Sequence, residues 1–146
     1  MSKADTWESG VIKLLLQNVD FTGLGDAGGV RGSAVAGTIY ISLHTSDPGE
    51  AGDQTTNEAS YTGYARKGVT RSTGEFSESG GVGTNINAQL FNLCTGGSAT
   101  ITHWGLGTAS SGAGKLLYSG ALPSSLAVSN NIQPNVAAGA LTITET

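Results

Sequence analysis

The chain has 146 residues, of which 12% are charged and 23 are Gly, roughly twice the usual Gly share of about 7%. A chain of this length is expected to form one domain, covering residues 1–146. The net charge of −4 with no basic block argues against nucleic-acid binding, and the single cysteine, Cys94, excludes an internal disulfide and a cysteine-rich zinc site.

The low charge is compatible with two kinds of surface. Protein interfaces are depleted in Lys and Glu, so the chain either contacts neighbours over much of its surface or is a monomer covered by Ser, Thr and Asn. The N-terminus lacks the pattern of a signal peptide, and no apolar run approaches the ~20 residues of a membrane helix. We therefore expect synthesis in a cytoplasm and no membrane partner.

The first predicted element is a helix over residues 6–18. Asp5 and Glu8 have the spacing of a capping box at its N-terminus. Gly10 weakens the helix by about 1 kcal/mol relative to Ala, and the run of three leucines is also compatible with the start of a strand. Apolar residues at helical spacing predict one wide stripe that docks on the body of the domain or on a neighbour: Trp7, Val11, Leu14 and Leu15, widened by Ile12 and Leu16.

Residues 20–37 are rich in Gly and Ala, which is the composition of a loop. Such a length without an element is unusual in a compact domain. We expect an arm or loop that is extended, ordered by a partner, or mobile.

Residues 38–146 are predicted to form a β-sandwich. The first strand, residues 38–44, alternates, so that Ile39, Ile41 and Leu43 lie on one face and Tyr40, Ser42 and His44 on the other. A polar loop follows, opening with a turn at Asp47-Pro48-Gly49. The next strand, residues 65–71, carries charges that suit the edge of a sheet.

The remainder of the chain consists of short apolar runs separated by turn residues every 8 to 12 positions, a spacing typical of a sandwich or barrel. Residues 72–83 are predicted to be rich in turns, and residues 95–98 are predicted to form a hairpin-sized turn. Strands are predicted at 86–94, 99–104 with an extension to 108, 115–122 ending at Pro123, 126–128 and 140–144. The expected fold is mainly β, a single sandwich of jelly-roll type with one N-terminal α-helix.

Three patterns in the sequence have residues that could carry chemistry, but their surroundings argue against it. The glycines of residues 23–28 fit G-x-G-x-x-G, but a dinucleotide site needs a strand before and a helix after them. His44 lies near Ser42 and Asp47, yet a polar strand-end histidine bonded to the loop backbone is the better interpretation.

The third pattern is the acidic loop. Its carboxylates have no calcium-loop spacing, so a solvated loop or pairing with Arg66, Lys67 or Arg71 is favoured over a metal. Those carboxylates are Asp47, Glu50, Asp53 and Glu58. We predict no catalytic residue, no cofactor and no metal.

Several runs of the chain resemble a family of small virion proteins of tailed bacteriophages. They are a leucine-His-Thr-x-Asp-Pro-Gly core at 43–49, an acidic Gly-rich loop, a Tyr-x-Gly-Tyr-Ala-Arg exit at 61–66, Cys-Thr-Gly-Gly at 94–97, the run from His103 to Gly112, and the ending from Gly120 to Leu141. The resemblance spans nearly the whole chain. It implies a virion structural protein, of the capsid decoration, collar or tail-fibre kind, and brings no catalytic residues.

The small size of the chain favours capsid decoration over a receptor-binding fibre. A receptor-binding fibre is usually long, with shaft repeats or a coiled coil, and this chain has neither. We therefore expect a capsid decoration (cement) protein on the capsid exterior, bound to the major capsid protein lattice and acting as a homo-oligomer, a dimer or trimer. The alternative is a collar or tail-fibre component involved in host attachment. A third class, an enzyme acting on cell-wall polysaccharide, would need two carboxylates paired for acid and base catalysis, and the sequence offers no convincing pair.

The surfaces expected to contact neighbours are the arm at 20–37, the loop at 44–71 and the N-terminal helix. Tyr and Arg are favoured anchors of interfaces, which draws attention to the tyrosines and arginines of the loop. The predicted contact residues are Trp7, Arg31, His44, Asp47, Tyr61, Tyr64, Arg66 and Arg71.

Overall fold

The computed structural model describes residues 2–25 and 28–145. It is mainly β with one N-terminal helix, which confirms the predicted fold class. Helix α1 (Asp5–Ile12) continues as a π-helical segment, η1 (Lys13–Gln17). The described residues then form nine strands: β1 (Thr38–His44), β2 (Lys67–Thr70), β3 (Phe76–Ser79), β4 (Val82–Asn85), β5 (Gln89–Leu90), β6 (Ala99–Gly107), β7 (Leu116–Val128), β8 (Asn135–Val136) and β9 (Thr142–Thr144).

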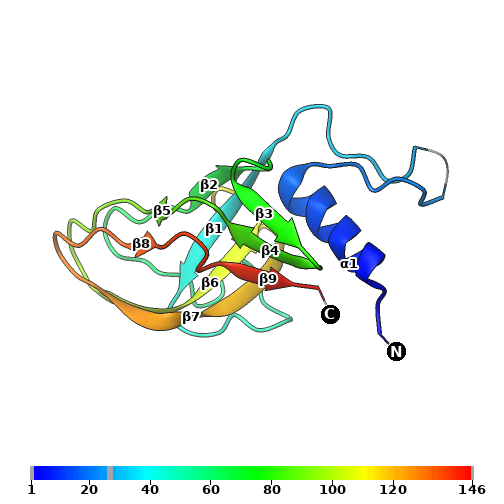
Figure 1. Cartoon of the computed structure of the whole chain (residues 1–146). Coiled ribbons are helices and arrows are strands. Elements are labelled where there is room, and N and C mark those ends of the chain that lie inside the picture. Colours follow the sequence, from blue (N-terminus) through cyan, green and yellow to red (C-terminus); the bar gives the residue numbers. More distant parts are fainter. Residues whose placement is uncertain (1, 26–27, 146) are drawn as a thin grey trace.

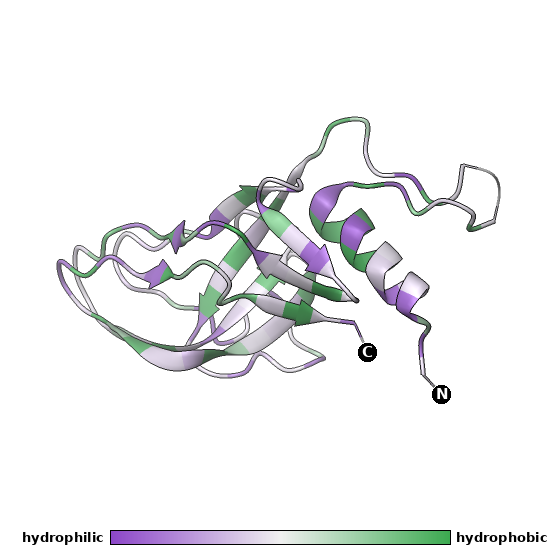
Figure 2. Cartoon of the chain, in the orientation of Figure 1, coloured by the Kyte–Doolittle hydropathy of each residue, from purple (hydrophilic) through white to green (hydrophobic). Residues whose placement is uncertain are grey.

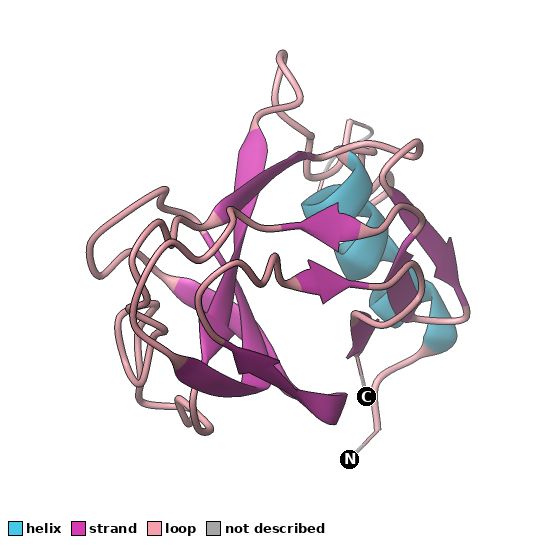
Figure 3. Ribbon diagram, turned by 90° about the vertical axis from the view of Figure 1, so that its left-hand side faces the viewer, coloured by secondary structure: helices cyan, strands magenta, loops and turns pink. Residues whose placement is uncertain are grey.

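The strands form three antiparallel sheets in a sandwich-like arrangement (Figure 1). The largest has the order β2-β1-β6-β7, so β2 and β7 are its edges, as the charges of the β2 region predicted for that strand. The second has the order β3-β4-β9, and the third pairs β5 with β8. Figure 3 shows the helix against one end of the strands, where α1 and η1 contact the β3–β4 hairpin.

Strand β1 lies at the centre of the core. Ile39, Ile41 and Leu43 are buried on one face, as predicted, and Figure 2 shows the hydrophobic colour that runs along this strand. Ser42 and His44 on the opposite face are fully buried as well, because the loop after β1 folds back over them. The alternation therefore identified the strand but did not show that both of its faces are covered.

The helix begins one residue earlier than predicted and lacks the predicted capping box. Ala4 is the N-cap, its carbonyl accepts the N–H groups of Trp7 and Glu8, and no side chain caps the helix. Ile12 and Leu16 are the fully buried helix residues. They pack on Gly83 of β4, where an added Cβ would overlap the Leu16 side chain.

Residues 18–25 and 28–37 form an arm without a helix or strand, in the region where a loop was predicted at 20–37, and contacts within the chain hold this arm. Asn18, at φ 58°, ends η1 and exchanges two hydrogen bonds with Ser33, at 2.8 Å and 2.7 Å. Phe21 forms an isolated β-bridge with Val30 and packs its ring over Gly10 of the helix. The arm projects from the body at the helix side of the molecule (Figure 1).

The prediction was wrong between residues 72 and 98. The supposed turn region contains the β3–β4 hairpin, whose tight turn uses Gly80 and Gly81 at positive φ of 58° and 77°. Only β5 remains of the predicted strand at 86–94, because Phe91 and Cys94 donate to the carbonyls of Pro134 and Ile132 at irregular intervals. Residues 95–98 do not form a hairpin turn, since β5 pairs with β8 and β6 pairs with β1 and β7.

Strand β7 joins two strands that were predicted as separate and runs through Pro123. Ile101 pairs with Leu126 whereas His103 pairs with Ala121, so β7 carries extra residues at this point and bulges. Pro lacks a backbone donor and is tolerated at bulges of edge strands. The edge position of β7 is therefore the reason that Pro123 does not end it.

Candidate functional site

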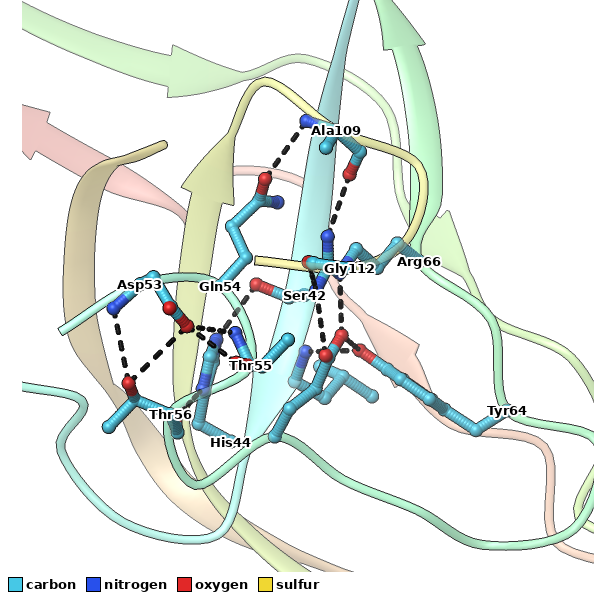
Figure 4. A network of polar contacts seen from close by, with 12 residues as sticks. Ser42, His44, Asp53, Gln54, Thr55, Thr56, Tyr64, Arg66, Ala109 and Gly112 are labelled. Atoms are coloured by element: carbon cyan, nitrogen blue, oxygen red, sulfur yellow. Dashed lines mark hydrogen bonds and ion pairs between the residues drawn. The ribbon is translucent and has the colours of Figure 1, made fainter. Parts of the chain in front are cut away.

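The most elaborate polar network of the described chain connects the loop after β1 to the segment after β6 (Figure 4). At its centre, Arg66 binds Glu58 through two parallel hydrogen bonds, Nε to Oε1 at 2.6 Å and Nη2 to Oε2 at 2.7 Å. The Arg66 side chain is 2% exposed, and Glu58 raises its pKa chiefly through these hydrogen bonds. Pairing between the acidic loop and Arg66, one of the predicted alternatives, is thus confirmed for Glu58.

The same guanidinium also holds the segment after β6. Nη1 donates to the carbonyl of Ala109 at 2.9 Å, and Nη2 donates to that of Gly112 at 2.7 Å. Planar, multiply donating Arg is suited to such a role because its donors point in fixed directions. Arg66 therefore ties together two segments that are more than forty residues apart in the sequence.

Tyr64 extends the network into the backbone of β1. Its hydroxyl accepts the N–H of Leu43 at 3.1 Å and donates to Glu58 Oε1 at 2.9 Å. Burial raises the pKa of Tyr64 above its usual range. Tyr61 meets the Tyr64 ring edge to face, with centroids 5.3 Å apart, and burial raises the pKa of Tyr61 to about 12. Both tyrosines are neutral hydrogen-bonding groups in the folded protein at ordinary pH.

His44 and Ser42 form a second, fully buried part of the network. His44 Nδ1 lies 2.8 Å from the carbonyl of Thr56, and Nε2 lies 2.8 Å from Ser42 Oγ. Burial lowers the pKa of His44, so the ring is neutral, Nδ1 donates to Thr56 and Nε2 accepts from Ser42. This confirms the predicted bond between the strand-end histidine and the loop backbone.

The Ser42–His44 contact resembles a nucleophile beside its base, but both side chains are inaccessible. Each has 0% exposure, and the histidine is oriented by a carbonyl instead of a carboxylate. A substrate cannot reach Ser42 Oγ in this arrangement. The pair therefore braces the loop against β1.

Gln54 is the third anchor of the loop and is also fully buried. The side-chain Oε1 of Gln54 accepts the backbone N–H of Ala109 at 2.9 Å, and the backbone N–H of Gln54 donates to the carbonyl of Ala113 at 2.9 Å. Its Nε2 has no acceptor among the described residues. A Cβ on Gly107 would overlap the Gln54 side chain, and one on Gly105 would come 2.6 Å from His44 Nε2.

The glycines at the end of β6 were the sequence signal for parts of this network that were not predicted. Ser42, Gln54 and the carbonyls of Ala109 and Gly112 were not recognised as parts of one network. An isolated Gly within a strand often marks the close approach of another group, and β6 ends with two of them. Alternate glycines in Trp104-Gly105-Leu106-Gly107 were the available signal.

The remaining carboxylates of the loop divide into two groups. Asp53 Oδ1 accepts the backbone N–H of Thr55 at 2.7 Å and its hydroxyl at 2.6 Å, and these bonds hold the pKa of Asp53 below its usual value. Asp47 and Glu50 are exposed. Within residues 2–25 and 28–145, no group of three or more His, Cys, Asp or Glu side chains is placed to hold a metal ion.

Burial corrects part of the predicted contact set. His44, Tyr61 and Arg66 are directed inside the domain, where their polar atoms are bonded to the protein's own groups, so they are not presented to a neighbour. Tyr64 and Arg71 are partly buried. Trp7, Arg31 and Asp47 are exposed, and their role as contacts stays a prediction.

Arg71 has a different internal role from Arg66. Its Nη2 donates to the carbonyl of Leu14 at the end of the helix, and its Nε donates to the carbonyl of Leu15 at 2.7 Å. It also reaches Ser33 Oγ at 3.3 Å and the Ala36 carbonyl at 3.4 Å in the arm. Arg71 therefore holds the helix and the arm on the edge of the main sheet.

Fold and network together define a small, β-rich domain whose polar side chains brace its own loops. The chain belongs to the family described as podophage GP4 fiber I protein gp80, whose model matches residues 28–144. It is thus a structural protein of a tailed-phage virion, as the resemblance implied. No curated protein matches the chain, and among the described helices none is long and apolar enough to cross a membrane.

Proposed function

We propose that this chain is a fibre component of a podophage virion that takes part in host attachment. The observation that carries this proposal is the family match, which includes every described strand and the whole braced loop. It favours the fibre alternative over the capsid decoration that size alone suggested. A fibre component works outside the cell. The loop after β1 is held there by the Arg66–Glu58 pair, the Ser42–His44 pair and Gln54, which fix its conformation.

The surface chemistry is consistent with a component that contacts other proteins. Large apolar side chains remain exposed at two ends of the molecule, one on the helix and arm and one around β5 and β8. They are Trp7, Val19, Leu24, Val30 and Val35 at the first end, and Ile86, Leu90, Leu93 and Ile132 at the second. Such side chains at separate sites suit contacts with two neighbours, which we assign to further copies of this chain in a dimer or trimer and to another virion protein.

Capsid decoration is the second candidate, with the major capsid protein as partner. The specific observation in its favour is the compactness of the described chain, whose helical segments end at Gln17 and which contains no shaft repeat or coiled coil. A decoration protein distributes many weak contacts over a lattice and needs no shaft. Both candidates are structural, and we infer no catalytic role for either, because Ser42 and His44, the nucleophile-like pair within the described residues, are fully buried.

Copy number in purified virions separates the two candidates. Quantitative mass spectrometry of virions, with the major capsid protein and a tail protein as internal standards, gives the ratio directly. A fibre component will be present at a copy number close to that of the tail proteins. A copy number close to that of the major capsid protein would overturn the fibre proposal and support decoration.

A further inference from the structure

Strand β7 leaves one side of its backbone unpaired over a long stretch. It is 13 residues long, pairs with β6 alone among the described strands, and forms the edge of the main sheet. Between residues 116 and 128, no backbone hydrogen bond from the described chain reaches its outer side. An unpaired edge of this kind is a template for the addition of another strand.

The protection that edge strands usually carry is confined to one part of β7. Pro123 and the bulge lie in the second half, whereas residues 116–121 contain neither a proline nor a charged side chain. The opposite edge of the sheet, β2, contains Lys67 and is flanked by Arg66 and Arg71. Charge on an edge discourages pairing. The first half of β7 has a single flanking charge, Lys115 directly before Leu116, and is therefore the less protected edge.

A groove of about 340 Å³ lies beside this less protected part. Its walls are residues 116–119 of β7 on one side and Asp47, Gly49 and Glu50 of the turn after β1 on the other. Of the four loop carboxylates, Asp53 and Glu58 are bonded within the loop, and Asp47 Oδ1 accepts the N–H of Gly49 at 2.9 Å. Asp47 and Glu50 are exposed, and no Lys or Arg of the described chain forms an ion pair with either.

We propose that an extended segment of another virion protein, bearing Lys or Arg, adds to residues 116–121 of β7 as an outer strand. Main-chain hydrogen bonds to the free edge bind the segment, and its basic side chains meet Asp47 and Glu50 across the groove. In strand addition the backbone supplies affinity and the flanking side chains supply selectivity. The inference does not depend on whether the chain belongs to a fibre or to the capsid.

The charge of the groove also argues against a second copy of this chain as occupant. Pairing β7 with β7 of a copy would bring two further acidic residues, the copy's own Asp47 and Glu50, towards the same ribbon. Like charges facing each other across strands are destabilising. A basic segment avoids this repulsion and forms ion pairs with Asp47 and Glu50. An uncharged or acidic segment forms no ion pair with these carboxylates.

The test uses the full chain and a short synthetic peptide of alternating Lys and Val, with a Glu-Val peptide as the matched control. Amide hydrogen exchange is followed residue by residue by NMR. We expect exchange at residues 116–121 to slow by about tenfold or more with the Lys peptide at saturation, and to stay unchanged with the Glu peptide. Equal protection by both peptides, or none by the Lys peptide, overturns the proposal.

Variants separate the edge from the charges. Asp47→Asn with Glu50→Gln should weaken Lys-peptide binding several-fold, whereas Asp5→Asn, an exposed change on the helix, should not. Ser119→Lys places a charge on the edge itself and should abolish protection, while Ser119→Thr should preserve it. Protection at 116–121 that rises with protein concentration in the absence of peptide would show that a second copy is the occupant, and would overturn the proposal.

Discussion

Arg66 and Glu58 form a two-bond ion pair inside the loop that follows β1, and Arg66 donates in addition to the carbonyls of Ala109 and Gly112. The pair is both an electrostatic contact and the point at which two long connections of a Gly-rich chain are held together. Its partners are all internal, so removal of either residue leaves charged or polar groups without partners in a largely buried setting.

Replacing Arg66 with Met should lower the free energy of unfolding by about 3 kcal/mol, because it leaves the Glu58 carboxylate unpaired. Urea denaturation measures this change. Lys115→Met removes an exposed cation that forms no ion pair within the described residues and should change stability by less than about 0.5 kcal/mol. The double variant with Glu58→Leu should lose less than the sum of the single losses, and strict additivity would contradict the coupling.

The stability of the protein should fall as the pH is lowered through the range in which free histidine titrates. His44 has a lowered pKa in the folded state because of burial, so the unfolded chain binds the proton more readily. Its contribution is complete above the unfolded pKa of about 6.5 and is lost progressively below it.

Urea midpoints for the native chain and His44→Gln between about pH 7.5 and about pH 5.5 check this. The variant will be less stable at the upper end, and the difference between the two proteins should shrink on acidification. A difference that is constant with pH would show that His44 does not titrate with folding. The carboxylates with lowered pKa, Asp53 among them, act at lower pH and are common to both proteins.

Gly107→Ala should destabilise the fold by about 2 to 3 kcal/mol, because the new methyl group overlaps the Gln54 side chain. Thermal or urea unfolding measures the loss. Shortening Gln54 to Ala in the same chain makes room for the methyl group, so the second substitution should cost less in the Gly107→Ala background than in the native one. Equal costs in both backgrounds would mean that the strand moves instead.

Gly10→Ala combines two opposing effects in the helix. Alanine is the better helix former by about 1 kcal/mol, but its Cβ would come 2.5 Å from the Phe21 ring, which now lies over Gly10. We expect faster amide exchange in the arm around Phe21 and no net gain in stability. In the Phe21→Ala background, Gly10→Ala should become stabilising. As a control, Thr6→Ala on the exposed face of the helix should be stabilising both with and without Phe21→Ala.

Local pattern predicted the fold class and several elements correctly. The helix, the arm, β1, β6 and the edge strand β2 followed from periodicity, glycine content and charge, which act over a few neighbouring residues. The β3–β4 hairpin was missed because its strands are short and polar, with Val82 and Phe76 as their only large apolar residues. Their status as strands comes from pairing and from the helix that packs on Gly83.

The sequence by itself determined a Gly-rich, weakly charged, β-rich chain with an acidic loop and the motifs of a phage structural family. Only the tertiary structure decided what the loop's conspicuous side chains do. His44, Tyr61 and Arg66 have the chemistry of a contact surface, yet they lie inside, because the loop folds over β1 and the segment after β6 closes on it. That outcome depends on hydrogen bonds between segments distant in the sequence, such as Arg66 to Ala109, which are 43 positions apart. The spacing of neighbouring residues cannot predict such contacts.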